Sequence, residues 1–189
     1  PAGGIEQAKE IVKNYPRFLD EFERLLTSNE ILRSRCQNVG ILSKELAVNA
    51  SITGPILRAS GVNYDIRKVD KYSIYDRFEF KVPLGKVGDV YDRYYVRILE
   101  MRESIKILQQ ILKQMTEKGE IISAKGAAAA KSPRMLKPPV GDAYGRIESP
   151  KGELGFYLVS DGSPKPYRYH VRPPSFISLT VLEDMCLGY

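Results

Sequence analysis

The sequence holds few of the residues on which metal and hydrolytic sites depend, with only two cysteines and one histidine in 189 residues. Cys36 and Cys186 form neither a CxxC pair nor a cysteine–histidine cluster with zinc spacing, so we expect two free thiols in a reducing compartment; a single disulfide also fits the sequence. His170 stands alone in a predicted strand, without the serine or cysteine partner of a hydrolytic triad, and we expect it to be structural.

Long apolar runs and blocks of like charge are also absent. No run approaches the roughly 20 apolar residues that cross a bilayer, and no leader-like segment is present, so we expect a chain that folds in water or on the water side of something larger. The net charge is +6, but basic and acidic residues alternate, and no nucleic-acid motif occurs, so we do not expect nucleic-acid binding. Neither a Walker A loop nor a GxGxxG motif is present.

The length suits one domain with its own core. Hydrophobic residues make up 43% and charged residues 28%, which is ordinary for a globular protein. The chain begins at Pro1 rather than at methionine and stops at Tyr189. We therefore expect a trimmed or partial polypeptide, with functional residues beyond either end.

Hydrophobic periodicity predicts that residues 1–115 form a helical core. Residues 5–29 read as a helix that is kinked or restarted at Pro16. Its apolar face consists of Phe18, Phe22, Leu25 and Leu26. The clearest helix spans residues 88–115, where apolar residues recur at steps of four and three, which predicts a buried seam. The seam consists of Tyr94, Ile98, Met101, Ile105, Leu108, Leu112 and Met115.

Polar residues mark the ends and the outer face of these helices. Asp89 is expected to cap helix 88–115, Ser43 to cap a shorter helix, and Asn29 to end the first one. The face opposite the seam carries Arg93, Arg97, Glu100 and Lys106. A solvated face explains such charges, and ion pairing with another subunit would give the same pattern.

The remaining segments predict turns and a small β portion. Residues 51–61, with two glycines and a proline, read as a turn-rich connector, and the alternation near residues 78–82 predicts a short strand. Residues 116–143 read as a low-complexity linker or loop. Residues 144–189 predict a β-hairpin and the start of a C-terminal helix in the same domain. The fold class is therefore α+β, mainly α, with a small antiparallel β portion.

Two charged stretches stand out. In GPILRASGVNYDIRK, residues 54–68, Arg58 lies between two glycines; a guanidinium beside closely approaching backbone can bind a carboxylate, a phosphate or an electronegative cluster. In ESPKGELG, residues 148–155, Glu148 and Lys151 flank a proline, which presents opposite charges rigidly. On physical grounds alone, a charged turn is the better explanation of each.

Several motifs in order resemble one family over most of the chain. TGPILRASGVNYDIRK, VRILEMRESIKILQQIL, ESPKGELGFYLVSDGSPKPYR and RPPSF resemble the D subunit of proton-pumping NADH–quinone oxidoreductases, the respiratory complex I family. ESPKGELG is similar to the E-x-P-(R/K)-G motif of the wider superfamily, which includes the large subunits of nickel–iron hydrogenases. The resemblance implies a helical core like that of the hydrogenase large subunit.

The resemblance also implies a place in a larger enzyme. The chain would be a core subunit of the peripheral arm, packed against the subunit that holds the terminal iron–sulfur cluster, and would help to form the quinone cavity. Other peripheral-arm and membrane-arm subunits would be its partners. NADH would be oxidised elsewhere in the complex, and electron transfer would be coupled to proton translocation. The complex would lie on the cytoplasmic face of a bacterial or archaeal inner membrane, or on the matrix face of the mitochondrial one.

By this resemblance, the candidates for positions near the quinone or the cluster are Arg58, Ser60, Gly61, Glu148, Lys151 and Arg172. The charge of Arg58 would tune a reduction potential and stabilise charge that develops on the quinone. Alternatively, Arg58 pairs with Asp65 or another carboxylate and fixes the fold. The quinone-contacting histidine and tyrosine of the family, and the aspartate beside that histidine, belong before Pro1. We therefore assign no catalytic residue and no metal ligand to this chain, and expect no quinone reduction by it alone.

Two other functions compete with this one. The large subunit of a membrane-bound nickel–iron hydrogenase would carry a CxxC pair near each end, which this chain lacks. An inactive scaffold paralogue would lack the upstream histidine, tyrosine and aspartate. The sequence does not separate NADH from reduced coenzyme F420 or ferredoxin as the electron donor.

Overall fold

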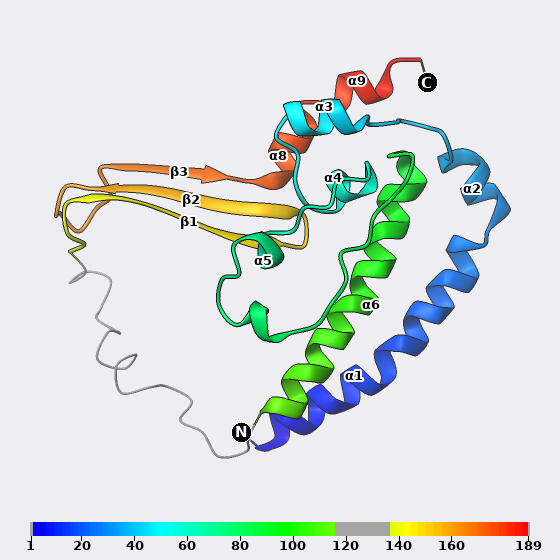
Figure 1. Cartoon of the computed structure of the whole chain (residues 1–189), viewed down its shortest axis with the longest axis horizontal. Helices are drawn as coiled ribbons and strands as arrows, with labels where there is room; N and C mark the ends of the chain where they lie inside the picture. Colours follow the sequence, from blue (N-terminus) through cyan, green and yellow to red (C-terminus); the bar gives the residue numbers. More distant parts are fainter. Residues whose placement is uncertain (1, 116–136, 189) are drawn as a thin grey trace.

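The computed structural model describes residues 2–115 and 137–188, which form a mixed fold of helices and one antiparallel sheet (Figure 1). Its helices and helical turns are α1 (Ala2–Phe22), the π-helical turn η1 (Glu23–Thr27), α2 (Glu30–Cys36), α3 (Lys44–Asn49), α4 (Gly54–Ala59), α5 (Ile66–Val69), the 3₁₀ turn η2 (Tyr75–Arg77), α6 (Val90–Gln114), α8 (Pro174–Leu179) and α9 (Leu182–Cys186). Its strands are β1 (Gly141–Ser149), β2 (Gly152–Ser160) and β3 (Arg168–Arg172).

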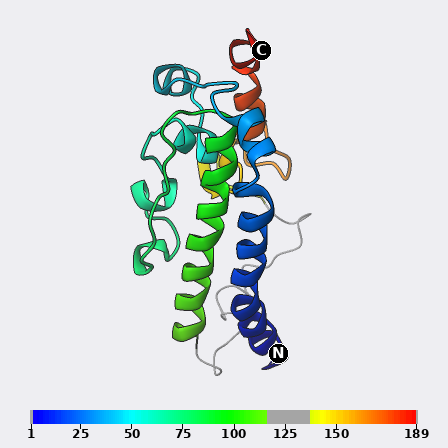
Figure 2. The same cartoon turned by 90° about the vertical axis from the view of Figure 1, so that its right-hand side faces the viewer.

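The two long helices, α1 and α6, lie side by side in antiparallel directions (Figures 1 and 2). Val12 and Leu19 of α1 pack against Ile105 of α6 in one apolar cluster. The seam predicted for α6 is confirmed at Ile98 and Ile105, which are both buried. Burial of these aliphatic side chains contributes about 1.5–3 kcal/mol each to holding the helix pair together.

Both long helices also expose apolar residues that the sequence placed on packed faces. Leu108 and Met115 of the predicted seam are 44% and 50% exposed, because α1 covers only part of the seam. On α1, the contact with α6 is made by Val12 and Leu19, so the predicted face is turned aside, and Phe18 and Phe22 are 49% and 51% exposed. The helix α1 continues through Pro16 to Phe22.

Polar caps fix the helix ends largely where the sequence predicts them. The Asp89 side chain accepts the backbone N–H of Asp92 at 2.7 Å at the start of α6. Ser43 caps α3 by accepting the N–H of Leu46 at 3.1 Å. Asn29 does not end the first helix but caps the start of α2, where an asparagine oxygen satisfies a free N–H.

The short strand predicted near residues 78–82 is not formed. Phe78 and Phe80 do alternate into the core, where they pack against Ile107. However, the intervening backbone bonds to side chains of α6 instead of to a second strand: the N–H of Glu79 donates to Gln110 at 2.9 Å, and that of Lys81 donates to Glu103 at 2.8 Å. Alternating burial here therefore reflects an extended segment that lies along a helix.

The connector predicted over residues 51–61 is also wrong, because its middle forms the helix α4, Gly54–Ala59. Pro55 lies in the first turn, where its missing N–H costs no hydrogen bond. Gly54 has a φ of +73°, and a Cβ atom there would lie 2.4 Å from the Cα of Gly152. The two glycines thus allow the start of α4 to touch the turn between β1 and β2.

The sheet has the strand order β1-β2-β3, and both strand pairs are antiparallel. The predicted hairpin is confirmed as β2 and β3, while β1 adds a strand that begins at Gly141, inside the predicted linker. The rest of that linker, residues 116–136, lies outside the described residues. The helix predicted after the hairpin is present as two short pieces, α8 and α9.

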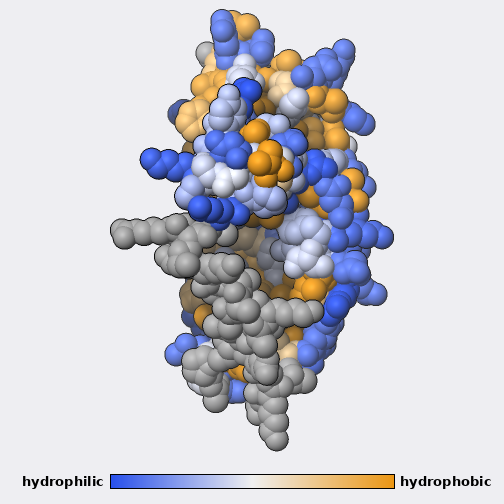
Figure 3. All heavy atoms as spheres, turned by 90° about the vertical axis from the view of Figure 1, so that its left-hand side faces the viewer, coloured by the Kyte–Doolittle hydropathy of each residue, from blue (hydrophilic) through white to orange (hydrophobic). Residues whose placement is uncertain are grey.

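The inner end of the sheet meets α4 and α5, and its outer end extends away from the long helices (Figure 1). Figure 3 looks onto the side of the outer end, where the surface is mainly hydrophilic around a small hydrophobic group. Within the described residues, no helix is long and apolar enough to cross a membrane. The inner end of the sheet is therefore the part that shapes the candidate site.

Candidate functional site

The candidate site centres on Arg58 in the last turn of α4, whose side chain is only 2% exposed. Glycines on two segments hold its backbone: the N–H groups of Gly61 and Gly85 donate to the Arg58 carbonyl at 3.0 and 2.9 Å. Gly61 has a φ of +79°, which an L-residue with a side chain rarely adopts. The glycine-flanked arginine is thus a buried group held by turns on both sides.

The Arg58 guanidinium joins four separate parts of the chain. Its Nε donates to Glu100 of α6 at 2.5 Å, and its Nη1 donates to Glu148 of β1 at 2.9 Å and to the carbonyl of Tyr64 at 3.0 Å. The same Nη1 lies 3.7 Å from a carboxylate oxygen of Asp65. Asp65, Glu100 and Glu148 are themselves 1%, 17% and 4% exposed, so this is a buried ionic network.

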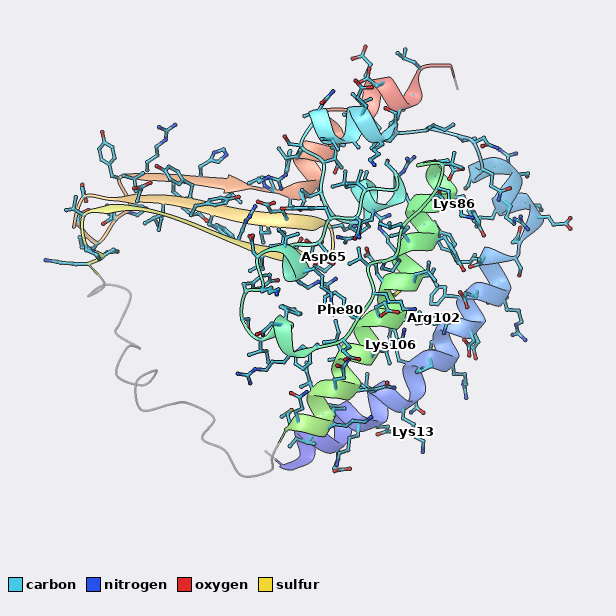
Figure 4. All side chains as sticks on the ribbon, viewed as in Figure 1. Lys13, Asp65, Phe80, Lys86, Arg102 and Lys106 are labelled. Atoms are coloured by element: carbon cyan, nitrogen blue, oxygen red, sulfur yellow. The ribbon has the colours of Figure 1, made fainter. Side chains whose placement is uncertain are left out.

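A second arginine completes this network. Arg67 binds Asp65 in a bidentate pair, with Nε at 2.9 Å and Nη2 at 2.6 Å from the two carboxylate oxygens. Asp65 also caps α5 by accepting the backbone N–H of Arg67 at 3.0 Å. The guanidinium of Arg67 lies over the ring of Phe80, 4.7 Å from its centroid. Figure 4 shows Asp65 on α5 near the inner end of the sheet.

Two carboxyl groups of the network have opposite pKa shifts. Burial raises the pKa of Glu148, and the charge of Asp65 adds to this effect, while Arg58 opposes it without cancelling it. Burial also raises the pKa of Asp65, but hydrogen bonds and charge from Arg67, together with Arg58, outweigh burial and hold that pKa below its ordinary value. Glu148 is therefore the more readily protonated of the two.

The network borders a cavity of about 400 Å³. Its lining residues are Arg58, Arg67, Arg97, Glu100, Met101, Ser104, Glu148, Ser149, Pro150 and Lys151. Arg97 of α6 donates to the carbonyl of Arg93 and has no ion-pair partner in the part of the chain that the structure describes. Burial and the nearby charge of Arg58 lower the pKa of Arg97, although Glu100 opposes this. The cavity thus offers cationic donors to a ligand rich in oxygen acceptors.

Three of the predicted site residues, Arg58, Glu148 and Lys151, line this cavity together. The turn that carries Lys151 is tight, because Ser149 pairs with Gly152 across it and the Ser149 hydroxyl donates to the Gly152 carbonyl at 2.7 Å. The close approach of Gly152 to the start of α4 brings this turn to Arg58. The E-x-P-K-G spacing therefore positions a carboxylate and an ammonium group on the lining of the cavity.

The other three predicted residues lie outside the cavity lining. Gly61 forms the turn after α4, and the Ser60 hydroxyl donates to the Leu42 carbonyl at 2.8 Å. Arg172, at the end of β3, donates to the carbonyls of Ser51 and Glu153 at 2.7 and 2.8 Å. These contacts hold loops around the network rather than facing the cavity.

Sequence reasoning misplaced two residues of the site and missed a third. Arg97 and Glu100 were expected on an outer face of α6, either solvated or ion-paired with another subunit, but they face the cavity because α4 packs there. Arg93 of the same face is half-buried and donates to backbone carbonyls, whereas Lys106 is exposed as expected. Arg67 was not predicted as a site residue. The signal available in the sequence was its position two residues after Asp65, the spacing at which a capping side chain accepts a backbone N–H.

Within the described ranges, no group of three or more His, Cys, Asp or Glu side chains could hold a metal ion. Cys36 is half-buried and Cys186 is exposed, and both are free thiols as predicted. An iron–sulfur cluster needs several cysteine thiolates in one place, and the described part of the chain does not provide them.

Comparison with known proteins identifies relatives over the whole sequence. The family model described as "Respiratory-chain NADH dehydrogenase, 49 Kd subunit" matches residues 1–189. The NADH-quinone oxidoreductase D subunit numbered 1 of Roseiflexus sp. (strain RS-1) is 58% identical over 190 residues, which cover 100% of this chain and 50% of the relative. The D subunit of the NADH-quinone oxidoreductase of Carboxydothermus hydrogenoformans (strain ATCC BAA-161 / DSM 6008 / Z-2901) is 46% identical over 188 residues, covering 100% of this chain and 49% of the relative.

A solved structure supports the same relationship. One chain of the membrane-bound sulfane sulfur reductase, an archaeal respiratory membrane complex, superposes with a TM-score of 0.87 at 36% sequence identity. The match covers 97% of this chain and 49% of that chain. The present chain thus spans about half the length of the curated relatives that it matches.

Proposed function

The chain belongs to the family of the 49-kDa subunit of respiratory-chain NADH dehydrogenase, and from this premise we propose that it serves in the peripheral arm of a complex I-type oxidoreductase. The names of its relatives, D subunits of NADH-quinone oxidoreductases, support quinone as the electron acceptor. Its partners would be other peripheral-arm and membrane-arm subunits. It would be peripheral to the membrane, on the cytoplasmic face in bacteria or archaea or on the matrix face in mitochondria.

The proposal includes a division of labour within the enzyme. The terminal iron–sulfur cluster would be held by a neighbouring subunit, and this chain would supply part of the wall of the quinone site. The helical core would follow the plan of the nickel–iron hydrogenase large subunit. The chain by itself would be inactive, because groups beyond these residues and the electron source belong to the rest of the complex.

The observation that carries this proposal is the buried network around Arg58 beside the 400 Å³ cavity. Reduction of a quinone to a quinol places negative charge on its oxygens and consumes protons. A guanidinium that buried carboxylates already hold in place stabilises such charge without reorganisation, because its donors are fixed before the reaction. Arg97 and Lys151 add cationic donors on the same lining.

Glu148 is suited to exchanging a proton in the same reaction. It lines the cavity, hydrogen bonds to Arg58 at 2.9 Å, and has a raised pKa because it is buried. When charge develops in the cavity, a carboxyl group of this kind can exchange a proton more readily than Asp65, whose pKa is held down by Arg67. We propose that this exchange is one step in coupling electron transfer to proton movement.

The relatives favour quinone over sulfur as the substrate. The quoted NADH-quinone oxidoreductase subunits are 46% and 58% identical to this chain. The chain from the sulfane sulfur reductase is 36% identical. The same peripheral position could serve either reductase, and the higher identities support the quinone side of this proposal.

Variants of Arg58 in the assembled enzyme test the proposal. We expect Arg58→Gln to lower kcat for quinone reduction by about 10²-fold, as loss of an electrostatic donor to a developing anion does, and Arg58→Lys to restore part of the rate. The matched control is Arg102→Gln, which breaks the ion pairs of α6 with Asp20 of α1 and Glu23 of η1, away from the cavity lining. If the assembled Arg58→Gln enzyme reduced quinone at the normal rate, the role of Arg58 would be only that of a structural ion pair.

A further inference from the structure

The Arg97 side chain lines the cavity beside Arg58 with most of its hydrogen-bond donors unused. Within the described ranges, Arg97 donates only through Nη1, to the carbonyl of Arg93. Glu100, one turn further along α6, does not pair with Arg97, because it binds Arg58 instead. No buried side-chain nitrogen or oxygen of the described residues lacks a hydrogen-bond partner, so the unpaired Nε and Nη2 of Arg97 remain accessible. Arg97 can therefore donate to a ligand in the cavity.

The two free nitrogens of Arg97 are the pair that binds a carboxylate side-on. Arg67 uses the same two atoms on Asp65, with Nε at 2.9 Å and Nη2 at 2.6 Å from the carboxylate oxygens. The parallel N–H groups of this edge match the spacing of two carboxylate oxygens, which makes the pair selective as well as strong. Arg97 thus presents to the cavity an edge that Arg67 has already filled.

The charges around the cavity favour a ligand with a single negative charge. The ionic network contains two arginines and three carboxylates, which leaves it one charge negative when all three are ionised. Arg97 and Lys151 add two cations to the same lining, and neither has an ion-pair partner in the part of the chain that the structure describes. The whole set therefore carries one net positive charge. Burial and the charge of Arg58 lower the pKa of Arg97, and a bound anion would relieve both effects.

The remainder of the lining suits a small apolar body beside that charge. Met101 of α6 and Pro150 of the turn between β1 and β2 line the same cavity. Its volume of about 400 Å³ lies within the roughly 300–1,000 Å³ that is usual for small-molecule pockets. A ligand that combines one carboxylate with a short apolar part would use both kinds of surface.

We propose that this cavity binds a small organic monocarboxylate, held by the free edge of Arg97, with Lys151 adding charge and with Met101 and Pro150 contacting the apolar part. Such a ligand would regulate the chain's enzyme by occupying the site proposed for the quinone. This regulatory consequence rests on the proposed function. The binding itself rests only on the free donors, the charge balance and the cavity.

The first test is calorimetric titration of this chain with sodium benzoate, with chloride used to hold the ionic strength constant. We expect one benzoate to bind per chain, more tightly than acetate or sulfate. Arg97→Gln should weaken benzoate binding about tenfold or more, because two charge-assisted hydrogen bonds are lost. The matched control is Arg102→Gln on the same helix (Figure 4), which lies off the cavity lining and should leave benzoate binding unchanged.

A second variant keeps the test decisive if Arg97→Gln lowers the stability of the chain. Lys151 is exposed and makes no ion pair within the described residues, so Lys151→Gln should melt like the unmodified chain. It should weaken benzoate binding several-fold, because one of the two uncompensated cations is lost. Unchanged binding in both variants would overturn the proposal.

The second test measures quinone reduction by the assembled enzyme. Benzoate should raise KM for the quinone without lowering kcat, and this effect should be weaker in Arg97→Gln. If benzoate binds in the calorimeter with the expected dependence on Arg97 but does not compete with the quinone, the carboxylate site stands and the quinone site proposed for this cavity is wrong.

Three other results would overturn the carboxylate site. Equally tight binding of sulfate would show a general attraction for anions. Equally tight binding of acetate would remove the apolar part from the proposal. Binding of benzoate by this chain but not by the assembled enzyme would mean that a group from a neighbouring subunit occupies the edge of Arg97.

Discussion

Replacement of Arg58 by methionine should destabilise the chain strongly. The methionine roughly fills the space of the arginine stem but removes the charge that Glu100 and Glu148 face at 2.5 and 2.9 Å. Those two carboxylates are 17% and 4% exposed, so little water can replace the lost guanidinium. The variant therefore leaves two buried acids without their shared partner.

Loss of one partner from a buried ion pair costs about 3–5 kcal/mol, because the remaining charge is uncompensated. A domain of this size has a total free energy of unfolding of roughly 5–15 kcal/mol, so the loss is a large fraction of it. At about 2–4 °C per kcal/mol, the expected fall in the melting temperature is roughly 6–20 °C. By contrast, loss of an exposed ion pair costs about 0–1 kcal/mol.

The assay is chemical denaturation followed by circular dichroism at several pH values. In the variant, Glu148 loses its cation, so its pKa in the folded state, which burial already raises, lies still further above that in the unfolded state. Stability from such groups is fully present below the unfolded pKa and is lost as the pH rises through the folded pKa. The deficit of Arg58→Met should therefore be largest near neutral pH and should shrink as the pH falls toward about 4.

A compensating variant separates loss of charge balance from loss of packing. Arg58→Met combined with Glu100→Gln and Glu148→Gln removes all three charges, and it should recover a large part of the lost free energy of unfolding. Recovery is expected because a neutral, well-packed set is often as stable as a buried ion pair. If Arg58→Met alone costs less than about 1 kcal/mol, or if the deficit does not depend on pH, the network is not what holds these elements together.

Three further predictions concern other parts of the fold. Gly152→Ala should lower the free energy of unfolding by about 1–3 kcal/mol in the same denaturation assay, because the φ of +126° at Gly152 and its contact with Thr53 leave no room for a Cβ atom. Gly145→Ala should be nearly neutral, because a Cβ atom at Gly145 would lie in open space. Because the folded pKa of Glu148 is raised, the stability of the natural chain relative to Glu148→Gln should fall as the pH rises above the ordinary glutamate value, which urea titrations at a series of pH values would detect. Ile105→Asp should lower the free energy of unfolding by several kcal/mol, because Ile105 is only 7% exposed between the long helices. If Ile105→Asp and the more exposed Leu108→Asp melted at similar temperatures, this packing would be contradicted.

The sequence predicts best those elements whose signals are local. The long helix was found within two residues of its bounds, because its heptad spacing and the cap at Asp89 are both encoded within the helix itself. The hairpin of β2 and β3 was found for the same reason, from alternating residues around a turn. The sequence also predicted the helical caps at Ser43 and Asp89, whose oxygen atoms bond to nearby N–H groups.

The failures concern contacts between distant segments. Phe78 and Phe80 alternate as a strand would, but a strand needs a partner, and the segment found side chains of α6 instead. The charges of Arg97 and Glu100 indicated a solvated face or ion pairs with another subunit, because nothing in the sequence of the helix shows that α4 packs there. Glu148 and Arg58 were each singled out, yet their pairing across 90 residues was not predictable from either motif alone.

The Arg58 network is difficult to explain as a device for stability alone. A set of apolar side chains of similar volume would hold α4, α6 and β1 together equally well, without the cost of removing five charged groups from water. Glycines at 54 and 152 are also needed to bring the two charged stretches into contact, and an ordinary packed core needs no such close approach. Burial of this kind, beside a cavity whose lining adds Arg97 and Lys151, is typical of sites where charge must be stabilised during a reaction. The network therefore favours a role for this inner end of the sheet in the chemistry of the proposed complex, and the contrast between Arg58→Gln and Arg102→Gln measures that role directly.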